Sequence, residues 1–432
     1  MPGMGRLGTP TAGDFYLYLV LDLMIVAGLV WLALSWKLGL PGPDSPGPRA
    51  GRLLGSRARL FLRRGLGTFW IIDGLLQAQP LMATRFASLV IAPVVHGQPS
   101  WFAQLLRLEI QLWQARPLDL AVTTVLVQVG LGLAILAGGD TRLGRLGLWL
   151  SIGWALAVWV GGEALGGMLA TGASEVTGAP GAVLLYATAA ALLLAPGRLW
   201  ISGAIPRGIR RGTGVFFLMG AILQALPFEG FWTGGHLHTA FLEMARMPQP
   251  HWLSAPIYAL ANLGQSHSTL LNAILVAIMA TLGVGLITGR APRAWSGLAL
   301  VWLATTWWLG QGLGGVGTGI ATDPNLSPLV ALLLVSAWLR TQPAPVPARV
   351  VPETASGQAI RRKLALSGLA ALVVGAVPAV VGLPLATLET ASHSASSSSA
   401  AVTASSVHSG PQFVVSGQPA GAPAFTEEGQ LR

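Results

Sequence analysis

The sequence contains no cysteine, and only 10% of its 432 residues carry a charged side chain. The lack of cysteine excludes disulfides, thiolate metal sites, thiol catalysis and iron–sulfur clusters. The scarcity of charge excludes an ordinary soluble protein, whose surface needs far more charged residues at this length. The sequence also lacks a Walker A loop, a dinucleotide-binding fingerprint and a serine-hydrolase elbow, so no catalytic residue can be assigned by motif.

Apolar residues dominate instead, at 53% of the chain, with 56 glycines and 16 tryptophans. They form ten runs that can cross a bilayer when tilt and neighbouring residues are allowed for. The sequence therefore predicts an all-α, polytopic membrane protein with about ten transmembrane helices. The predicted spans are residues 15–36, 66–83, 119–138, 146–165, 181–196, 214–228, 269–288, 295–311, 328–339 and 364–385.

Basic residues are concentrated in alternate loops between these spans. Twenty of the 26 fall in residues 37–65, 139–145, 197–213, 289–294 and 340–363. This asymmetry is the positive-inside pattern, which places those loops in the cytoplasm and both termini on the extracytoplasmic side. The net charge of +10 is then explained by contact with membrane lipids, and nucleic acid is not expected as a partner.

Two pairs of segments repeat within the chain. Arg64–Pro80 reads RGLGTFWIIDGLLQAQP and Arg211–Pro227 reads RGTGVFFLMGAILQALP, with 8 of 17 positions identical. Residues 154–180 match 302–328 in the same way, and the offsets of the two pairs, 147 and 148, nearly agree. Each copy contains four spans, so both copies enter the membrane from the same side and should be related by an axis along the membrane normal.

The expected organisation is two parallel four-helix repeats with one flanking helix at each end. The boundaries are an N-terminal helix and basic loop (1–63), the first repeat (64–200), the second repeat (207–340), a basic loop with the last helix (341–385), and a Ser-rich, disordered extracytoplasmic tail (386–432).

A four-helix unit that opens with Arg-Gly-x-Gly-x-Phe and continues to Leu-Gln resembles the DoxX/DoxD family of bacterial membrane proteins. The matching residues run from Arg64 to Gln77 and, less well, from Arg211 to Gln224. The resemblance implies a multi-pass protein of the bacterial cytoplasmic membrane that serves a respiratory or sulfur-oxidation redox assembly. It also implies partner subunits in a membrane complex, and it leaves open a contact with quinone.

Several polar residues fall within or beside the predicted spans. Asp73 is in the middle of the second span, where a carboxylate is costly unless it is protonated or paired, so it is a functional candidate by default. Gln77 lies one helical turn away and Gln224 repeats it, so both are expected partners of Asp73. Glu163, with its repeat counterpart Gln311, lies in a glycine-dense segment at the outer end of a span. The alternative for all five is structural, as polar contacts between helices or a snorkelling acid.

Further candidates lie in the predicted outer loops. Ser174-Glu175 and Thr322-Asp323 shortly precede spans, a pattern typical of helix caps. A run of imidazoles and thioethers suits copper, although the same stretch reads as an amphipathic interfacial helix. The candidate metal ligands are His236, His238, Met244, Met247 and His251.

Three functions follow from these observations. The first is an integral subunit or anchor of a redox assembly, as the resemblance implies. The second is a transporter or channel-like protein with a polar pathway between the two repeats, lined by Asp73, Gln77, Glu163, Gln224 and Gln311. The third is a non-catalytic scaffold for an extracytoplasmic enzyme.

Overall fold

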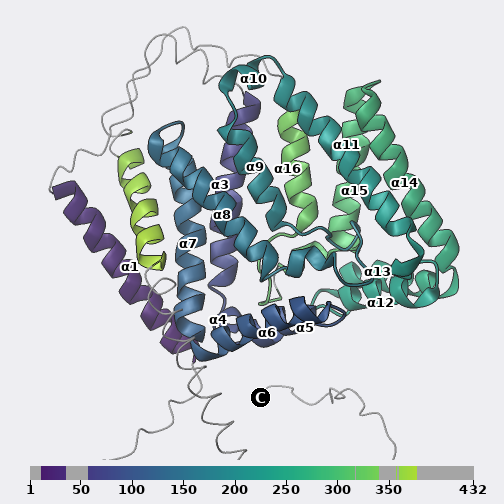
Figure 1. Ribbon diagram of the computed structural model, residues 1–432, viewed down its shortest axis with the longest axis horizontal. Coiled ribbons are helices and arrows are strands. Elements are labelled where there is room, and N and C mark those ends of the chain that lie inside the picture. The colour runs from purple at the N-terminus through teal and green to yellow at the C-terminus, as the bar shows by residue number, and fades with distance from the viewer. Residues whose placement is uncertain (1–10, 36–56, 317, 340–356, 358–359, 377–432) are drawn as a thin grey trace, which may run out of the picture. The chain divides into compact units, whose positions relative to one another are not determined.

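A computed structural model describes residues 11–35, 57–316, 318–339, 357 and 360–376 (Figure 1). All regular secondary structure in these residues is helical, and no strand occurs among them. The all-α fold class is therefore confirmed. The predicted tail, residues 386–432, lies outside the described residues, as do parts of the two basic loops that follow the first span and precede the last.

Four of the helices are long and apolar enough to cross a membrane. They are Ala12–Val30 within α1 (Ala12–Ser35), α7 (Pro117–Gly138), α8 (Arg142–Val160) and α14 (Ser268–Thr288). Helix α1 exposes Leu17, Leu21 and Met24, and a continuous apolar surface of this kind is typical of contact with lipid. The length and hydropathy of these four helices are compatible with a membrane protein.

The other predicted spans coincide with helices that are shorter or less apolar. The ten-span topology stays a prediction, because α9 and α16 contain only 12 and 13 residues, whereas about 20 are needed to cross a bilayer without tilt or flanking segments. The helices that coincide with the remaining predicted spans are α3 (Arg57–Gln77), α9 (Val183–Leu194), α11 (Ala204–Ala225), α15 (Pro292–Leu309), α16 (Leu326–Trp338) and residues 360–376.

Shorter helices lie at the ends of the long ones (Figure 1). The predicted interfacial helix is divided into two, because Pro250 ends the connection and begins a new helix. Only α10 (Gly197–Ile201) lies at the upper end in this view. The helices at the lower end are α4 (Pro80–Phe86), the π-helical η1 (Ala87–Ile91), α5 (Ala92–Val94), α6 (Ser100–Ala115), η3 (Pro227–Glu229), α12 (Gly234–Ala245) and α13 (His251–Ser266).

The second glycine of each Arg-Gly-x-Gly motif allows two helices to approach closely. A Cβ on Gly67 of α3 would lie 3.1 Å from the Gly132 carbonyl oxygen of α7. A Cβ on Gly214 of α11 would lie 2.8 Å from the Gly283 carbonyl oxygen of α14. Small residues that let backbones meet are the usual means of packing helices in a membrane. The motif shared by the two segments therefore has the same packing role in both halves.

In the described part of the chain, the two flanking helices share an apolar cluster with the first half. Phe15 and Val26 of α1 share an apolar cluster with Val122 of α7 and with Ala370 and Val374 of the last helix. In Figure 1 these helices lie beside α7, away from α11, α14 and α15. Helix α7 is consequently the most enclosed of the four candidate spans, with 72% of its apolar window buried.

The loops predicted to be cytoplasmic meet at one end of the long helices. Arg59 Nη2, at the start of α3, lies 2.9 Å from Asp140 Oδ1 in the α7–α8 turn and 3.1 Å from the Leu193 carbonyl oxygen at the end of α9. Arg210 of α11 donates to the Leu286 carbonyl near the end of α14. The predicted alternation of spans requires these loops to lie at the same end of the helices.

Cysteine labelling provides a test of the orientation. Gly208 lies in a predicted cytoplasmic loop and Gly235 on the predicted outer side, and an added Cβ at either position meets no atom within 4 Å. Gly235→Cys should react with a membrane-impermeant maleimide in intact cells, and Gly208→Cys only after permeabilisation. The native chain contributes no background because it has no cysteine. Labelling of Gly208→Cys in intact cells would contradict the topology.

Candidate functional site: an acidic cavity between two loops

Two loops of matching geometry connect α8 to α9 and α15 to α16. Each begins with a 3₁₀ turn, η2 (Ala164–Gly167) or η4 (Gly312–Gly315), in which a leucine and a glycine adopt positive φ. Trp159 Nε1 donates to the Pro180 carbonyl at 2.7 Å, and Trp307 Nε1 donates to the Pro324 carbonyl at 2.8 Å. The tryptophans and glycines of the second repeated segment therefore build the same loop twice.

Glu163 and its counterpart Gln311 each bind the start of the helix that follows their loop. Glu163 Oε1 accepts from the amides of Ala182 at 3.0 Å and Val183 at 3.2 Å. Gln311 Oε1 accepts from the Ser327 amide at 3.1 Å. The expectation of a snorkelling acid at Glu163 was therefore wrong, because its carboxylate turns inward to the unpaired amides of a helix N-terminus.

The predicted capping role of Glu175 was also wrong. Glu175 is 1% exposed, and its Oε2 accepts from Trp302 Nε1 of the other half at 3.3 Å. A Cβ on Gly220 of α11 would lie 3.0 Å from Glu175 Cβ, so this side chain occupies the space that a larger residue would fill. Gly220 is the repeat counterpart of Asp73. The carboxylate missing from the second copy is thus replaced by Glu175 from the loop of the first copy.

Asp323, the repeat counterpart of Glu175, is bonded within its own loop. Its oxygens accept from the Asn325 amide at 2.6 Å and the Thr322 hydroxyl at 2.8 Å, while Asn325 itself caps α16. A Cβ on Gly319 of the same loop would lie 3.5 Å from Leu81 Cδ1 of α4, so the second loop reaches the first half.

Asp73 is 2% exposed, so its side chain faces the protein interior, as expected for a carboxylate in a span. Its neighbour is Tyr186 of α9, which is fully buried and packs on Trp70 with a ring-centroid distance of 4.5 Å. Asp73 Oδ1 and Tyr186 Oη are both buried, and neither has a hydrogen-bond partner among the described residues. Tyr186 was missed, although a hydroxyl in an otherwise apolar predicted span was the available signal.

The two glutamines expected beside Asp73 are buried but have different roles. Gln224 Oε1 accepts from the Ser174 hydroxyl at 2.5 Å, and its Nε2 donates to Asn272 Oδ1 at 2.7 Å. Gln224 therefore belongs to a polar network of the second half that includes the first loop. Gln77 is 6% exposed on α3, one turn after Asp73. Gln224 is thus not the partner of Asp73 that the repeat symmetry suggested.

A cavity of about 590 Å³ lies between the two loops. Glu163, Gln311 and Asp323 line it, and α12 adds Glu243 and Met244. No basic residue is among the described residues that line it. The first loop is held by Glu229 of the second half, whose Oε2 accepts from the amides of Gly172 at 2.7 Å and Ala173 at 2.9 Å. The cavity is therefore an acidic space enclosed by both halves.

Burial raises the pKa of three acids in the two loops. Burial, and then the Asp323 charge, raises the pKa of Glu163, against the Val183 and Ala182 amides, which lower it. Burial also raises the pKa of Asp323, against the Thr322 hydroxyl and the Asn325 amide. Burial raises the pKa of Glu175 to about 7, although the Trp302 indole opposes this shift. Glu175 can therefore exchange a proton near neutral pH.

The five candidate metal ligands are divided among different surroundings. Met244 and Met247 come together, since a Cβ on Gly312 would lie 3.5 and 2.8 Å from their sulfur atoms. His238 Nδ1 lies 3.0 Å from the Ala261 carbonyl, His236 packs edge-on against Phe231, and His251 is exposed. In the described part of the chain, no three His, Asp or Glu residues are placed to hold a metal ion. The copper hypothesis stays a prediction.

No family model, no curated protein and no solved structure matches this chain. The DoxX/DoxD resemblance and the redox function that it implies therefore stay predictions.

Proposed function

We propose that this protein is a multi-pass transporter of the bacterial cytoplasmic membrane that carries a small organic cation through the cavity between its two repeats. The observation that supports this most is the cavity of about 590 Å³ lined by Glu163, Glu243 and Asp323 without a described basic residue. Carboxylates without cationic partners attract a positively charged ligand. The cation would enter from the extracytoplasmic side, where the positive-inside pattern places both termini and these loops.

The size of the cavity favours an organic cation over a bare metal ion. Small-molecule sites usually enclose about 300–1,000 Å³, whereas a single water takes about 30 Å³ of liquid volume. Met244, Met247 and Ile320 give one part of the wall an apolar character. An ammonium group near the carboxylates and an apolar body near the thioethers would match this lining.

The position of the cavity supports a transport role. In transporters built from internal repeats, the substrate binds at the interface of the repeats, where irregular backbone lines a cavity. Here the first loop is attached to the second half, through Glu175 and Trp302 and through the Gly172 and Ala173 amides, which donate to Glu229. A movement of one repeat against the other would change both sides of the cavity at once.

The buried acids would couple cation binding to proton release. A cation beside Glu163 and Asp323 favours their charged forms and so lowers their pKa. By linkage, a drop in pH then weakens binding of the cation. Asp73 and Tyr186 would hold a proton that the cavity groups exchange. Exchange of a cation for a proton is therefore the expected mode of transport.

The proposal is tested in liposomes that contain the purified protein and an internal pH-sensitive dye. Tetramethylammonium, choline or spermidine added outside should raise the internal pH as cations enter and protons leave. Asp323→Asn and Asp73→Asn should reduce the rate at least tenfold, because the amide cannot release a proton. Asp22→Asn, the same substitution in the span of α1, should leave the rate near that of wild type. No response to any of these cations, or an equal loss in Asp22→Asn, would contradict the proposal.

The redox role that the resemblance implies makes a different prediction. A subunit of a redox assembly should copurify, in mild detergent, with haem- or copper-containing proteins or with a quinone-reducing activity. A scaffold for an extracytoplasmic enzyme should copurify with that enzyme and transport no cation. Absorbance spectra and mass spectrometry of the purified material distinguish these outcomes from a transporter isolated alone.

A further inference from the structure

A second cavity, of about 420 Å³, lies at the opposite end of the helices from the acidic one. It is formed by the first turns of α3, the end of α7 and the start of the last helix. Arg63, Arg64 and Arg361 line it, whereas the other side chains around it are apolar, with Leu60, Leu133 and Leu136 among them. No acidic residue is among the described residues that line this cavity.

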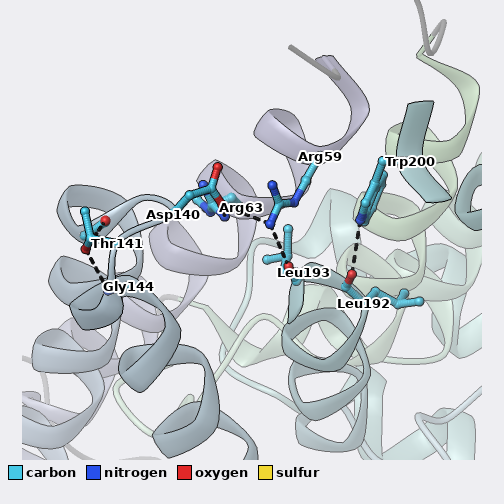
Figure 2. Close-up of polar contacts among 9 residues, drawn as sticks. Arg59, Arg63, Asp140, Thr141, Gly144, Leu192, Leu193 and Trp200 are labelled. Carbon is cyan, nitrogen blue, oxygen red and sulfur yellow. Dashed lines mark hydrogen bonds and ion pairs between the residues drawn. The ribbon is translucent and has the colours of Figure 1, made fainter. Parts of the chain in front are cut away.

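Partly buried ion pairs fix the arginine side of this cavity (Figure 2). Arg63 is 8% exposed and binds Asp140 in the α7–α8 turn, and Arg59 Nη2 lies 2.9 Å from the same carboxylate oxygen. Burial raises the pKa of Asp140, but its bonds and charge interactions with Arg63 and Arg59 outweigh this and lower it. Asp140 is therefore ionised at neutral pH and holds both guanidinium groups in place.

Arg63 presents an unsatisfied hydrogen-bond donor at this cavity. Its side chain lines the cavity beside Arg64 and also binds Asp140. Arg63 Nε is buried without a hydrogen-bond partner among the described residues. A buried donor without an acceptor is costly, so an anion with several acceptor oxygens would stabilise this arrangement.

We propose that this cavity binds the phosphate of an anionic phospholipid. Guanidinium groups match phosphate oxygens in planar, bidentate hydrogen bonds. The leucines beside the arginines provide the surface that acyl chains would cover, which a free phosphate ion would leave unused. The predicted topology places these arginines at the cytoplasmic face, where basic cavities between helices bind lipid headgroups. This inference is independent of the transport function.

The test uses the full chain, purified and delipidated in detergent. Added phosphatidylglycerol should raise the midpoint of thermal unfolding by several degrees, and native mass spectrometry should show a retained lipid. Phosphatidylcholine, which has no net charge, should do neither. A rise of the same size with inorganic phosphate would overturn the lipid assignment, because it would show that the apolar surface contributes nothing.

Substitutions of arginines that line the cavity provide a second test of lipid binding. Arg64→Gln/Arg361→Gln should lower phosphatidylglycerol retention at least fivefold, while Arg207→Gln, an exposed arginine of α11 at the same end, should retain it. Both substitutions leave the ion pairs of Arg59 and Arg63 with Asp140 in place. If the double variant fails to fold, Arg64→Gln alone should lower retention at least twofold. Retention equal to that of wild type in a folded variant would overturn the proposal.

Discussion

Alanine at position 166 should lower the free energy of unfolding by about 2–5 kcal/mol. Gly166 has a φ of +64°, in the left-handed region where a side chain is strained. A Cβ at this position would also overlap the backbone of Pro180 and lie 2.5 Å from the Gly181 amide nitrogen. Because both contacts are with backbone, no side-chain rotation can relieve them. The loop would have to move away from Pro180, and this movement would also open the acidic cavity.

Gly167→Ala is the matched control. Gly167 has a similar φ of +73°, but a Cβ there meets no atom within 4 Å. Its substitution should therefore show only the cost of the left-handed conformation, about 1–2 kcal/mol. Unfolding of both variants in mixed micelles of increasing SDS, followed by tryptophan fluorescence, measures the difference. Equal destabilisation would show that Gly166 has no close contact with Pro180.

The helical architecture could be predicted from the sequence because lipid imposes simple rules on it. Long apolar runs such as that of α14 predict a helix directly, and the observed element, Ser268–Thr288, differs from the prediction by one residue at its start. The limits of α3 and α8 were less accurate. Helix α3 begins at Arg57, nine residues before the predicted apolar span, because its first turns are amphipathic and basic. Hydropathy alone does not detect such turns.

The repeat predicted where polar residues occur but not which of them meet. Alignment placed Gln224 opposite Gln77 and so suggested that both lie beside Asp73. In the structure, the first loop crosses to the second half, so Gln224 binds Ser174 and Trp302 binds Glu175. Such an exchange depends on the paths of two loops between packed helices, which one-dimensional alignment does not contain.

Gly220, a glycine of the second repeat, carries the sequence evidence for this crossing. Gly220 replaces Asp73 in the second copy, which suggests on its own that the second half lost a functional group. The structure shows instead that Glu175 fills the space that Gly220 leaves. Both halves therefore keep a buried carboxylate beside their first helix, Asp73 in the first and Glu175 in the second.

Glu175 should make the stability of the protein depend on pH. Its pKa is raised to about 7 by burial in the folded protein, from an ordinary value of 4.5. The folded state therefore binds a proton more tightly than the unfolded state between these two values. The resulting stabilisation is complete below pH 4.5 and is lost as the pH rises through 7. At pH 8 the difference is about 3 kcal/mol, since one pKa unit corresponds to about 1.4 kcal/mol.

Glu175→Gln should remove this dependence. The amide is neutral at every pH, and its oxygen can still accept from Trp302 Nε1, as Glu175 Oε2 does at 3.3 Å. Unfolding in SDS should show the variant and the wild type equally stable near pH 4.5, and the variant more stable by about 3 kcal/mol at pH 8. Glu163 and Asp323 titrate in both proteins, so the difference between the two curves isolates Glu175. A constant offset between the curves from pH 4.5 to 8 would show that Glu175 keeps an ordinary pKa, and therefore that it is solvated rather than enclosed between the two halves.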